Sequence, residues 1–494
     1  MNIATLLSGL NYTVVQGTED KEVSDIRYNS KDCKKGNIFF ALYGRDWDGH
    51  LYIEDAIGNG ADAVVFQNHE AVTPEFLKKW EDREVSFIHT DDTRMALALS
   101  SKIFWGSPND DLLTIGVTGT KGKTTTTHMI KKILDDAGIK TGIIGTIKNG
   151  YTGHYEEGDN TTPESYQVYR MMRDMVDNGC KAVVMEVSSQ GLKYHRVDGI
   201  DFDFGLVTNV SPDHIGTGEH TDFYDYFCSK KKLLQMCKTA VINMDDDFCR
   251  KMCWESGAEK IISYGFDEEA AYRLRQVRLT NFNGTFGIVC HCRAGSLEWE
   301  TPIPLPGKYN GYNAVAAMTV CGEIGVDLRE AAKSLSDISV RGRSEIVKGT
   351  RNYNVIIDYA HNGMSLKHLL ETLREYKPER LIVVFGCGGE RDKLRRYDMG
   401  KVATTYADYS IVTSDNPRNE DPHTIIEDIV SVMTISSEKY RVIVDRREAI
   451  NFAIKHAKPG DTIVIAGKGH ETYQIIGNEK RHFDDREVVQ KLIN

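Results

Sequence analysis

The stretch Leu112–Thr127, LLTIGVTGTKGKTTTT, decides the fold, because it joins an apolar strand to a helix through a glycine-rich turn. The apolar run at its start shows no polar alternation, which is typical of a strand buried in a parallel sheet. The residues from Lys123 begin a helical pattern that ends at Gly138. Such a turn is suited to phosphate groups, since backbone N–H groups and the helix N-terminus face the anion.

The loop is a variant of the usual phosphate-binding sequence. The usual spacing is a glycine, four residues and then Gly-Lys-Thr, but Val117 stands at the first position here and Gly119 lies inside the loop. Lys123 adds a point charge for the phosphates, and the hydroxyl of Thr124 can bind Mg²⁺. The sequence therefore predicts nucleotide binding by a variant loop.

The alternation of strand and helix patterns continues along the chain and predicts an α/β protein with parallel sheets. Further buried-strand patterns, several of which run into polar turns, are AVVMEV, FGLVTNV, TAVINM, NVIIDYAHN, RLIVVFGCGGERD, YSIVTSDNPR and DTIVIAGKGHE. A chain of 494 residues is too long for one core, so we expect three domains. Their expected ranges are 1–108 for a small α/β domain, 109–340 for the central phosphate-loop domain and 341–494 for a Rossmann-like domain.

Composition narrows the class of function. The chain is 40% hydrophobic and 27% charged, with a formal net charge of −11. An acidic surface does not attract nucleic acid or anionic membranes, so neither is expected as a partner. The N-terminal residues lack a signal-peptide pattern, no apolar run is long enough to cross a bilayer, and the ten cysteines lack zinc-knuckle spacing. We therefore expect a reduced, cytoplasmic protein.

Two polar residues at predicted strand ends are candidates for the chemistry. Glu186 ends the AVVMEV strand, and His214 follows the FGLVTNV strand. A strand-end glutamate is usually solvated or capped, but one strand away from a phosphate loop it becomes a candidate magnesium ligand. A lone histidine is more often structural, so the case for His214 depends on the residues around it.

Taken together, these segments resemble the Mur ligases of bacterial peptidoglycan synthesis. The loop has the form of that family, glycine-threonine-x-glycine-lysine-threonine-threonine. Further segments similar to family motifs follow in order: TTPE, EVSSQGL, NVSPDHIG, LPGKYNGYNA, RGRSE, DYAHN, GCGGERDK, SDNPRNEDP and AGKGHETYQ. The last four resemble the MurE type, the UDP-N-acetylmuramoyl-tripeptide synthetases. The resemblance covers almost the whole chain.

The resemblance implies an ATP-dependent amide ligase that uses Mg²⁺. ATP would phosphorylate a substrate carboxylate, and an incoming amine would then displace phosphate from the acyl phosphate. Several negative oxygens meet in such a site, which calls for metal ions and cationic donors. The implied ATP-binding residues are Gly119, Thr120, Lys121, Gly122, Lys123, Thr124, Thr125, Asn313, Arg343, Asp358 and His361.

The implied catalytic residues and metal ligands lie in the expected central domain. Thr124 and Glu186 would bind magnesium, and His214 would help at a second magnesium, while Lys123 would act on the phosphates. The family also uses a carbamylated lysine as a metal bridge. FCSKKKLL offers three adjacent lysines, and matching this run to the family pattern back from Leu233 favours Lys230. Carbamylation needs a neutral amine, so we expect Lys230 in an enclosed site that lowers its pKa.

The resemblance also implies two substrate sites. UDP-N-acetylmuramoyl dipeptide would lie between the first and second domains, and the third domain would bind the incoming amino acid. The implied residues for the nucleotide-sugar peptide are Ser30, Thr161, Thr162, Ser188 and Arg196. Those for the amino acid are Arg391, Asp415, Asn416, Arg418, Gly467 and Glu471. The DNPR segment is similar to that of enzymes that add meso-diaminopimelate. This amino acid has a second carboxylate that lysine lacks, and arginine can bind a carboxylate bidentately.

Departures from the family pattern leave other interpretations open. DYAHNGMSL and GGERDKLRR replace the usual DYAHTPDSL and GGDRDKGKR, and Lys121 stands where asparagine is common. A second hypothesis is therefore a ligase of the same superfamily that adds L-lysine or another amino acid, or acts on a different acceptor. A third is a phosphate-loop NTPase switch or scaffold, which would not need His214 or the strand-end ligands. We expect a monomer whose third domain closes on ATP about a hinge near Val340–Gly342.

Overall fold

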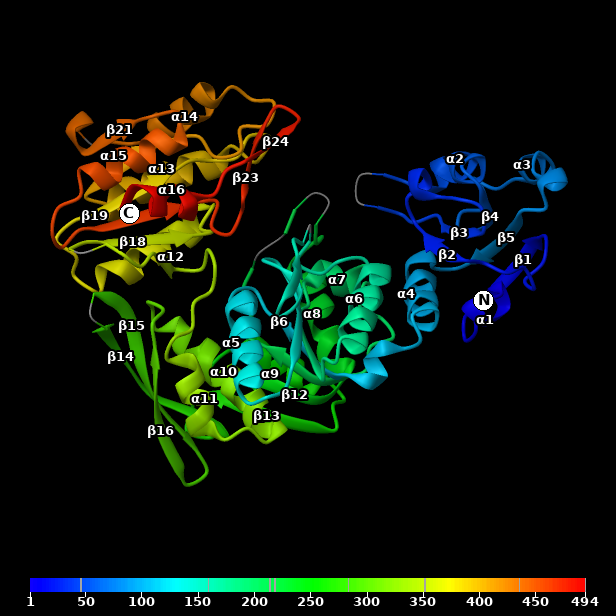
Figure 1. Ribbon diagram of the computed structural model, residues 1–494, viewed down its shortest axis with the longest axis horizontal. Helices are drawn as coiled ribbons and strands as arrows, with labels where there is room; N and C mark the ends of the chain where they lie inside the picture. Colours follow the sequence, from blue (N-terminus) through cyan, green and yellow to red (C-terminus); the bar gives the residue numbers. More distant parts are fainter. Residues whose placement is uncertain are drawn as a thin grey trace. The chain divides into compact units, whose positions relative to one another are not determined.

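The computed structural model describes residues 1–44, 47–158, 160–212, 215–216, 219–282, 284–350, 352–434 and 436–493 (Figure 1). The chain divides into two compact units, Met1–Tyr264 and Gly265–Asn494. Both combine sheets with helices, so the predicted α/β class is confirmed. The three predicted domain ranges stay a prediction. No helix in the described ranges is long and apolar enough to cross a membrane.

A five-stranded sheet with the order β1-β5-β4-β3-β2 opens the first unit. Strands β2 to β5 are parallel, and β1 is antiparallel to β5. Alternate residues of β3 enter different cores, since Ile38 packs with residues of α1 and α4 and Phe39 with residues of α2. The strands are β1 (Tyr12–Gln16), β2 (Asp25–Arg27), β3 (Asn37–Phe40), β4 (Ala61–Phe66) and β5 (Ser86–Thr90), and the helices are α1 (Ile3–Leu6), α2 (Ile53–Gly58), α3 (Pro74–Lys78) and α4 (Thr93–Phe104).

The glycine-rich loop belongs to a second sheet of this unit, whose order within the unit is β13-β12-β11-β6-β10-β7-β8-β9. The strands from β13 to β7 are parallel. Because β6 lies between β10 and β11, the loop after β6 is adjacent to the ends of both neighbours. The strands are β6 (Leu113–Thr118), β7 (Thr141–Ile144), β8 (Asn149–Tyr151), β9 (His154–Glu156), β10 (Ala182–Glu186), β11 (Phe202–Val207), β12 (Cys237–Asn243) and β13 (Lys260–Gly265).

Helices pack on this sheet in two separate cores. Residues of α6 and α7 pack with β10 in one cluster, and residues of α8 and α9 pack with β11 and β12 in another. The strand registers place both clusters on one face of the sheet, and Ile115, Val117 and Val184 on the other face are also fully buried, which explains why the strands show no alternation of polar residues. The helices are α5 (Lys123–Asp136), α6 (Ser165–Asp177), α7 (Ser189–Lys193), α8 (Phe223–Gln235) and α9 (Asp247–Trp254).

The second unit begins with three antiparallel strands and two helices. These are β14 (Tyr272–Phe282), β15 (Thr285–Ala294), β16 (Leu297–Ile303), α10 (Tyr309–Ile324) and α11 (Leu328–Leu335). Phe286 of β15 stacks on Tyr376 at a centroid distance of 4.5 Å, and it belongs to the same core as the helices of the next sheet. The antiparallel strands therefore share a core with the rest of this unit.

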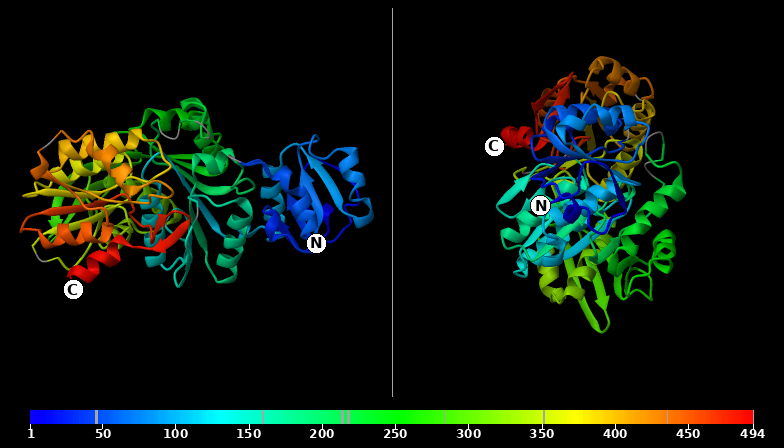
Figure 2. Two further views of the ribbon diagram at one scale, coloured as in Figure 1. Left: turned by 90° about the horizontal axis from the view of Figure 1, so that it is seen from above. Right: turned by 90° about the vertical axis from the view of Figure 1, so that its right-hand side faces the viewer.

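A six-stranded sheet forms the rest of the second unit, with the order β17-β18-β22-β19-β20-β21. Only the β17–β18 pair is antiparallel. Helices α12 to α14 pack in one core, α15 and α16 pack in another, and the helices lie on both faces of the sheet (Figure 2). The strands are β17 (Glu345–Ile346), β18 (Asn354–Asp358), β19 (Leu381–Phe385), β20 (Tyr409–Val412), β21 (Tyr440–Val442) and β22 (Thr462–Ala466), with a separate hairpin β23 (Tyr473–Ile476) and β24 (Glu479–His482). The helices are α12 (Gly363–Arg374), α13 (Leu394–Tyr406), α14 (Pro422–Val430), α15 (Arg446–Lys455) and α16 (Asp485–Ile493).

All ten cysteines lie within the described residues as free thiols, and eight of them are buried. Burial raises the pKa of Cys33 to about 11 and that of Cys237 to about 12. Desolvation disfavours a thiolate, so these side chains act as small apolar residues. The structure is thus consistent with the absence of any disulfide framework in the sequence.

Candidate functional site

The glycine-rich loop has a backbone conformation that strongly favours glycine. Gly119 has φ +144° and Gly122 has φ +88°, both in the left-handed region. A Cβ atom on Gly119 would lie 1.9 Å from Oγ1 of Thr208, which no real structure allows. Gly122 precedes the first residue of α5, so the loop leads directly from β6 into the N-terminus of this helix. The N–H groups of Thr120 and Lys121 donate to Asn209, so the N-terminus of α5 is the part of this geometry that suits an anion.

Two lysine side chains converge on the same carbonyl of this loop. Nζ of Lys123 donates to the carbonyl oxygens of Gly119 and Thr120, at 2.8 and 3.2 Å. Nζ of Lys230, on α8, also donates to the Gly119 carbonyl at 2.8 Å. The Lys230 side chain is 1% exposed and lies over the ring of Tyr226. Two ammonium groups close to one loop carbonyl bring positive charge to the loop in which the sequence predicts phosphate binding.

Glu186 is the buried acid on the neighbouring strand. It ends β10, is 1% exposed, and its Oε2 accepts from Oγ1 of Thr124 at 2.8 Å. Thr146 donates its N–H to Oε1 at 2.8 Å and its hydroxyl to Oε2 at 3.1 Å. A hydroxyl and a carboxylate oxygen are ligands that Mg²⁺ prefers, so Thr124 and Glu186 fit such an ion.

The remaining predicted metal ligand, His214, lies outside the described residues. Within the described ranges, no group of three or more histidine, cysteine, aspartate or glutamate side chains is arranged to hold a metal ion. Of the predicted metal ligands, Thr124 and Glu186 are the oxygen pair that the described residues bring together.

Four of the five residues predicted for the nucleotide-sugar peptide, all except Ser30, meet near the end of β10. Oγ1 of Thr162 accepts from the N–H of Ser188 at 2.9 Å and donates to the Glu186 carbonyl at 2.9 Å. Arg196 donates to the Thr162 carbonyl at 2.9 Å. Thr161 contacts Oγ1 of Thr146 at 3.0 Å, so these side chains form a continuous set with Glu186.

Arg196 has a charged partner that the sequence did not indicate. Its Nη2 is 2.8 Å from Oε1 of Glu164, and Arg94 of α4 is 3.1 Å from Oε2 of the same carboxylate. Two guanidinium groups thus share one carboxylate, which leaves excess positive charge for an anionic ligand. Ser30 lies in the first sheet region, is 7% exposed, and its carbonyl accepts from Asn59 at 3.0 Å. Its contacts are local to that region.

The predicted ATP-binding residues of the second unit lie in two regions, one near the end of β18 and one on α10. Asp358, at the end of β18, accepts from the N–H of Ser344 at 2.6 Å and from that of Ala360 at 2.8 Å. Burial raises the pKa of Asp358, while the nearby Arg343 opposes the shift. Asn313 lies on α10, is 6% exposed, and donates to Oδ1 of Asn310 at 3.0 Å.

Tyr359 links the predicted ATP-binding residues to the amino-acid side of this unit. Its ring lies 4.7 Å from that of His361 and 4.9 Å from the guanidinium of Arg343. Burial raises the pKa of Tyr359 to about 12, and the Glu471 carboxylate adds to the shift. Burial also lowers the pKa of His361. The predicted residues Arg343 and His361 therefore contact one aromatic ring, and the charge of Glu471 influences it.

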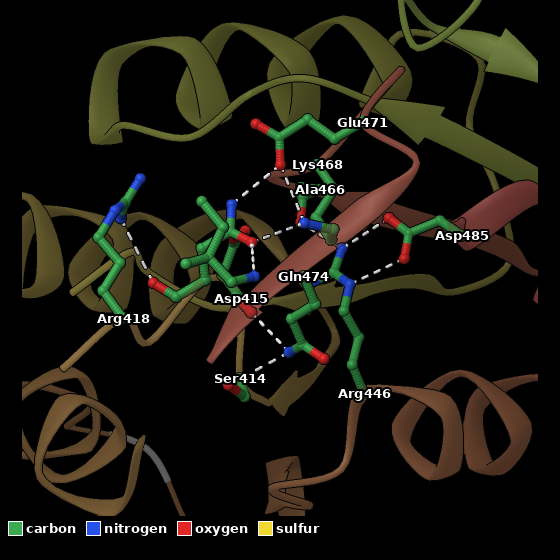
Figure 3. A network of polar contacts seen from close by, with 11 residues as sticks. Ser414, Asp415, Arg418, Arg446, Ala466, Lys468, Glu471, Gln474 and Asp485 are labelled. Carbon is green, nitrogen blue, oxygen red and sulfur yellow. Dashed lines mark hydrogen bonds and ion pairs between the residues drawn. The ribbon is translucent and has the colours of Figure 1, made fainter. Parts of the chain in front are cut away.

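The residues predicted for the amino acid, except Arg391, lie in a polar network at the ends of β20 and β22 (Figure 3). Asn416 donates to Oε2 of Glu471 at 2.9 Å, and Arg418 donates to the Gly389 carbonyl at 2.8 Å. Gly467 has φ +116°, and a Cβ there would lie 2.5 Å from Oδ2 of Asp415. Glycine is thus required where the chain passes the Asp415 carboxylate.

Arg418 has a left-handed backbone, with φ +53°, that the β23–β24 hairpin stabilises. Its N–H donates to the Ile475 carbonyl at 3.1 Å, and its carbonyl accepts from Gly477 at 2.8 Å. Arg391 is exposed in the loop after β19. A Cβ on Gly388 would lie 3.0 Å from Nη1 of Arg418 and 3.7 Å from Cγ of Arg391, so both arginines border this glycine.

Sequence reasoning missed three residues of these sites, Thr146, Arg94 and Lys468. Thr146 and Arg94 contact Glu186 and Glu164 from 40 and 70 residues away, and no local pattern marks them. Lys468 lies within the quoted AGKGHETYQ segment, and a lysine between two glycines was the signal that could have identified it.

These features define a class of protein, an α/β protein with a phosphate loop, a buried acid on the adjacent strand and a charged network at the ends of other parallel strands. Three family models match the chain in order. They are "Mur ligase family, catalytic domain" at residues 22–105, "Mur ligase middle domain" at 117–321 and "Mur ligase, glutamate ligase domain" at 342–469.

The chain belongs to the Mur ligase family, which confirms the predicted resemblance. It is 40% identical to a Clostridium tetani protein named UDP-N-acetylmuramoyl-L-alanyl-D-glutamate–2,6-diaminopimelate ligase, over 100% of this chain and 99% of that protein. A Clostridium perfringens protein of the same name is 38% identical, with the same coverage.

Solved structures agree with this assignment. One of a protein with the same name is 28% identical, with a TM-score of 0.69, and the match covers 100% of this chain and 98% of that chain. Folylpolyglutamate synthase of Mycobacterium tuberculosis, solved with ADP and AMPPCP, has a TM-score of 0.62 at 16% identity, over 81% of this chain and 95% of its own. The second likeness is one of fold alone.

Proposed function

We propose that the protein is an ATP-dependent ligase that joins meso-diaminopimelate to UDP-N-acetylmuramoyl-L-alanyl-D-glutamate through an acyl phosphate. The observation that carries the proposal is the full-length identity of 40% to a relative named for this reaction. The charged network around Arg418 and Glu471 supports it, since it offers donors and acceptors to a zwitterionic amino-acid head.

The phosphate loop and Lys123 would bind the ATP phosphates. The N-terminus of α5 suits the anion, and Lys123 brings positive charge to the loop beside the Gly119 carbonyl. Thr124 and Glu186 would hold Mg²⁺, which neutralises phosphate charge when bound. His214 is kept in the proposal as a further magnesium ligand.

Lys230 is also the proposed site of carbamylation. Addition of CO₂ to the neutral amine, with loss of one proton, would give a carbamate. The Lys230 side chain is enclosed at 1% exposure, as such a group requires, and its N–H can keep the hydrogen bond to Gly119. The carbamate would turn a cationic side chain into an anionic one that suits a metal ion.

The other predicted residues are assigned by their position in the two units. Thr161, Thr162, Ser188, Arg196 and Ser30 would hold the nucleotide-sugar peptide, and Asn313, Arg343, Asp358 and His361 would contact the nucleotide. Arg391 and Arg418 would bind the carboxylate of the amino-acid head, and Asp415, Asn416, Gly467 and Glu471 would accommodate its ammonium. The cytoplasmic location, the monomeric state and the absence of nucleic-acid and membrane partners stay predictions.

The direct test supplies ATP, Mg²⁺ and the UDP-muramoyl dipeptide and compares phosphate release with meso-diaminopimelate and with L-lysine, the product being identified by mass. We expect turnover with diaminopimelate and a lower kcat/KM with lysine. Lys123→Ala should abolish turnover, whereas Lys132→Ala, on the same helix and paired with Asp136, should retain it. A preference for lysine would leave the ligase assignment standing and remove the specificity, and ATP hydrolysis without a peptide product would contradict both.

A further inference from the structure

Lys468 is a fully buried lysine in the middle of the amino-acid network. It follows β22, is 0% exposed, and its Nζ donates to Oδ1 of Asn416 at 3.0 Å and to Oε2 of Glu471 at 2.9 Å. Its Nζ also lies 5.5 Å from the centre of the Tyr473 ring. A buried ammonium is stable only when it is paired and hydrogen-bonded, and both of its partners are residues proposed for the amino acid.

The contacts of Lys468 fix the orientation of both partners. Oδ1 of Asn416 accepts from Lys468 and also from the N–H of Ile475 at 3.0 Å, so the amide nitrogen of Asn416 faces Glu471. Oε2 of Glu471 accordingly accepts from two donors, Lys468 and Asn416. Figure 3 shows the other carboxylate oxygen of Glu471 directed away from these donors. That oxygen is placed to accept from a further donor.

The charges of the network balance when Lys468 is included. Lys468 and Arg418 are cations, and Glu471 and Asp415 are anions, so these four side chains sum to zero. Arg391 is not counted in this set, because it is exposed and solvent screens its charge. The neighbouring Arg446 does not change this sum, because it is paired with Asp485 at 2.7 Å and both side chains are 0% exposed. A neutral network suits a ligand head with one ammonium and one carboxylate. A lone ammonium would leave an uncompensated charge in a site of low dielectric.

We infer that Lys468 is a positioning residue that sets the amino-acid selectivity of the proposed ligase, favouring a zwitterionic side-chain head over a lone ammonium. The inference rests on the proposed function and concerns the amino-acid site alone. Lys468 acts through Glu471 and Asn416 by holding their oxygens and by balancing the Glu471 charge. Without it, the four-residue set would carry one net negative charge and would suit the ammonium of lysine better.

The test compares wild type with Lys468→Met, which removes the charge and the donor, and Lys468→Gln, which keeps an N–H donor without the charge. Steady-state kinetics are measured with meso-diaminopimelate and with L-lysine at saturating ATP and UDP-muramoyl dipeptide. We expect both variants to lose about 10- to 100-fold in kcat/KM for diaminopimelate, chiefly through KM, because a charged hydrogen bond is lost. With lysine the change should be less than about threefold, so selectivity should fall at least about tenfold.

Lys480→Met is the matched control. Lys480 lies 4.0 Å from the centre of the same Tyr473 ring but is exposed on β24, so its removal should leave both kcat/KM values within about twofold of wild type. Circular dichroism checks the fold of each variant, and if Lys468→Met does not fold, Lys468→Gln decides the result. Equal losses of kcat/KM with both amino acids, or an unchanged kcat/KM with diaminopimelate, would overturn the inference. The proposed function would still stand in that case, because it depends on turnover by the wild type. Absence of wild-type turnover with either amino acid would instead refute the function itself.

Discussion

Individual buried or half-buried charged side chains stabilise the structure around the candidate sites. Asp225, near the start of α8, accepts from Nζ of Lys193 at 2.6 Å and from the N–H of Thr221 at 3.1 Å. Burial by itself would raise the pKa of Asp225, but these hydrogen bonds and the nearby His220 outweigh it and lower the pKa to about 2. Asp225 therefore helps to hold the helix that bears Lys230.

We predict that Asp225→Asn costs about 2 kcal/mol of unfolding free energy at pH 7, because the folded pKa lies about two units below that of the unfolded chain. A depressed carboxylate pKa stabilises the fold above the unfolded value and loses this effect as the pH falls toward the folded value. The difference between variant and wild type should thus fall to about half at pH 3. Urea unfolding at both pH values measures it.

The control for this prediction is Asp136→Asn. Asp136 pairs with Lys132 on the surface of α5 and is 43% exposed, so the substitution should cost less than about 0.5 kcal/mol at either pH. A loss at Asp225 that does not change between pH 7 and pH 3 would contradict the assigned pKa shift.

Two helix starts in the second unit are joined by one ion pair. Arg446 is the first residue of α15 and Asp485 is the first residue of α16, and Nε and Nη2 of the arginine donate to the two carboxylate oxygens at 2.8 and 2.7 Å. Nη2 also donates to the Ala466 carbonyl at 3.0 Å, at the end of β22. The pair therefore ties two helices to the strand that leads into Gly467 and Lys468 (Figure 3).

We predict that Arg446→Met destabilises the protein by about 3–5 kcal/mol, because it leaves Asp485 as a buried charge without its partner. Arg446→Met combined with Asp485→Leu should recover most of the loss, since two apolar residues replace the whole pair. Urea unfolding gives the free energies, and hydrogen exchange should show faster exchange in α15 and α16 for the single variant.

Arg481→Ala provides the comparison at the surface. Arg481 pairs with Glu479 at 2.7 Å, but the side chains are 61% and 70% exposed, so its loss should change stability by less than about 0.5 kcal/mol. If the double variant were as unstable as Arg446→Met alone, the loss would come from packing and not from the unpaired carboxylate.

For the molecule as a whole, the proposed chemistry requires residues of both units. The phosphate loop and Glu186 belong to the first unit, and the network around Lys468 belongs to the second. The proposed reaction therefore needs both units to contact the acyl phosphate and the incoming amine at the same time. The hinge near Val340–Gly342 stays a prediction.

We predict that an ATP analogue, Mg²⁺, UDP-muramoyl dipeptide and diaminopimelate together reduce the radius of gyration, because bound ligands favour the conformation in which both units contact them. Small-angle scattering with and without the ligands measures this. Lys123→Ala, in which phosphate binding is weakened, should show a smaller reduction at the same ligand concentrations. An unchanged radius in the fully liganded wild type would contradict closure.

The sequence predicted the parts of the molecule that depend on local patterns. β6, the glycine loop and α5 could be placed because an apolar run, left-handed glycines and a helical pattern follow one another within Leu112–Asp136. The division into two units could not be predicted in this way. Phe286 packs in the core of a sheet whose other residues come almost entirely from later in the chain. The contacts of Thr146, Arg94 and Lys468 could not be predicted either, because they depend on the tertiary structure, which local sequence patterns do not reveal.

The free cysteines have a practical consequence for handling and assaying the protein. Eight thiols are inaccessible in the folded chain, and Cys228 and Cys237 are the two that are partly accessible. Oxidants and alkylating reagents act on exposed thiolates, so the native enzyme should tolerate them with little loss. Rapid labelling of the other eight thiols would indicate local or global unfolding. The reactivity of these cysteines can therefore be used to monitor the folded state during purification and storage.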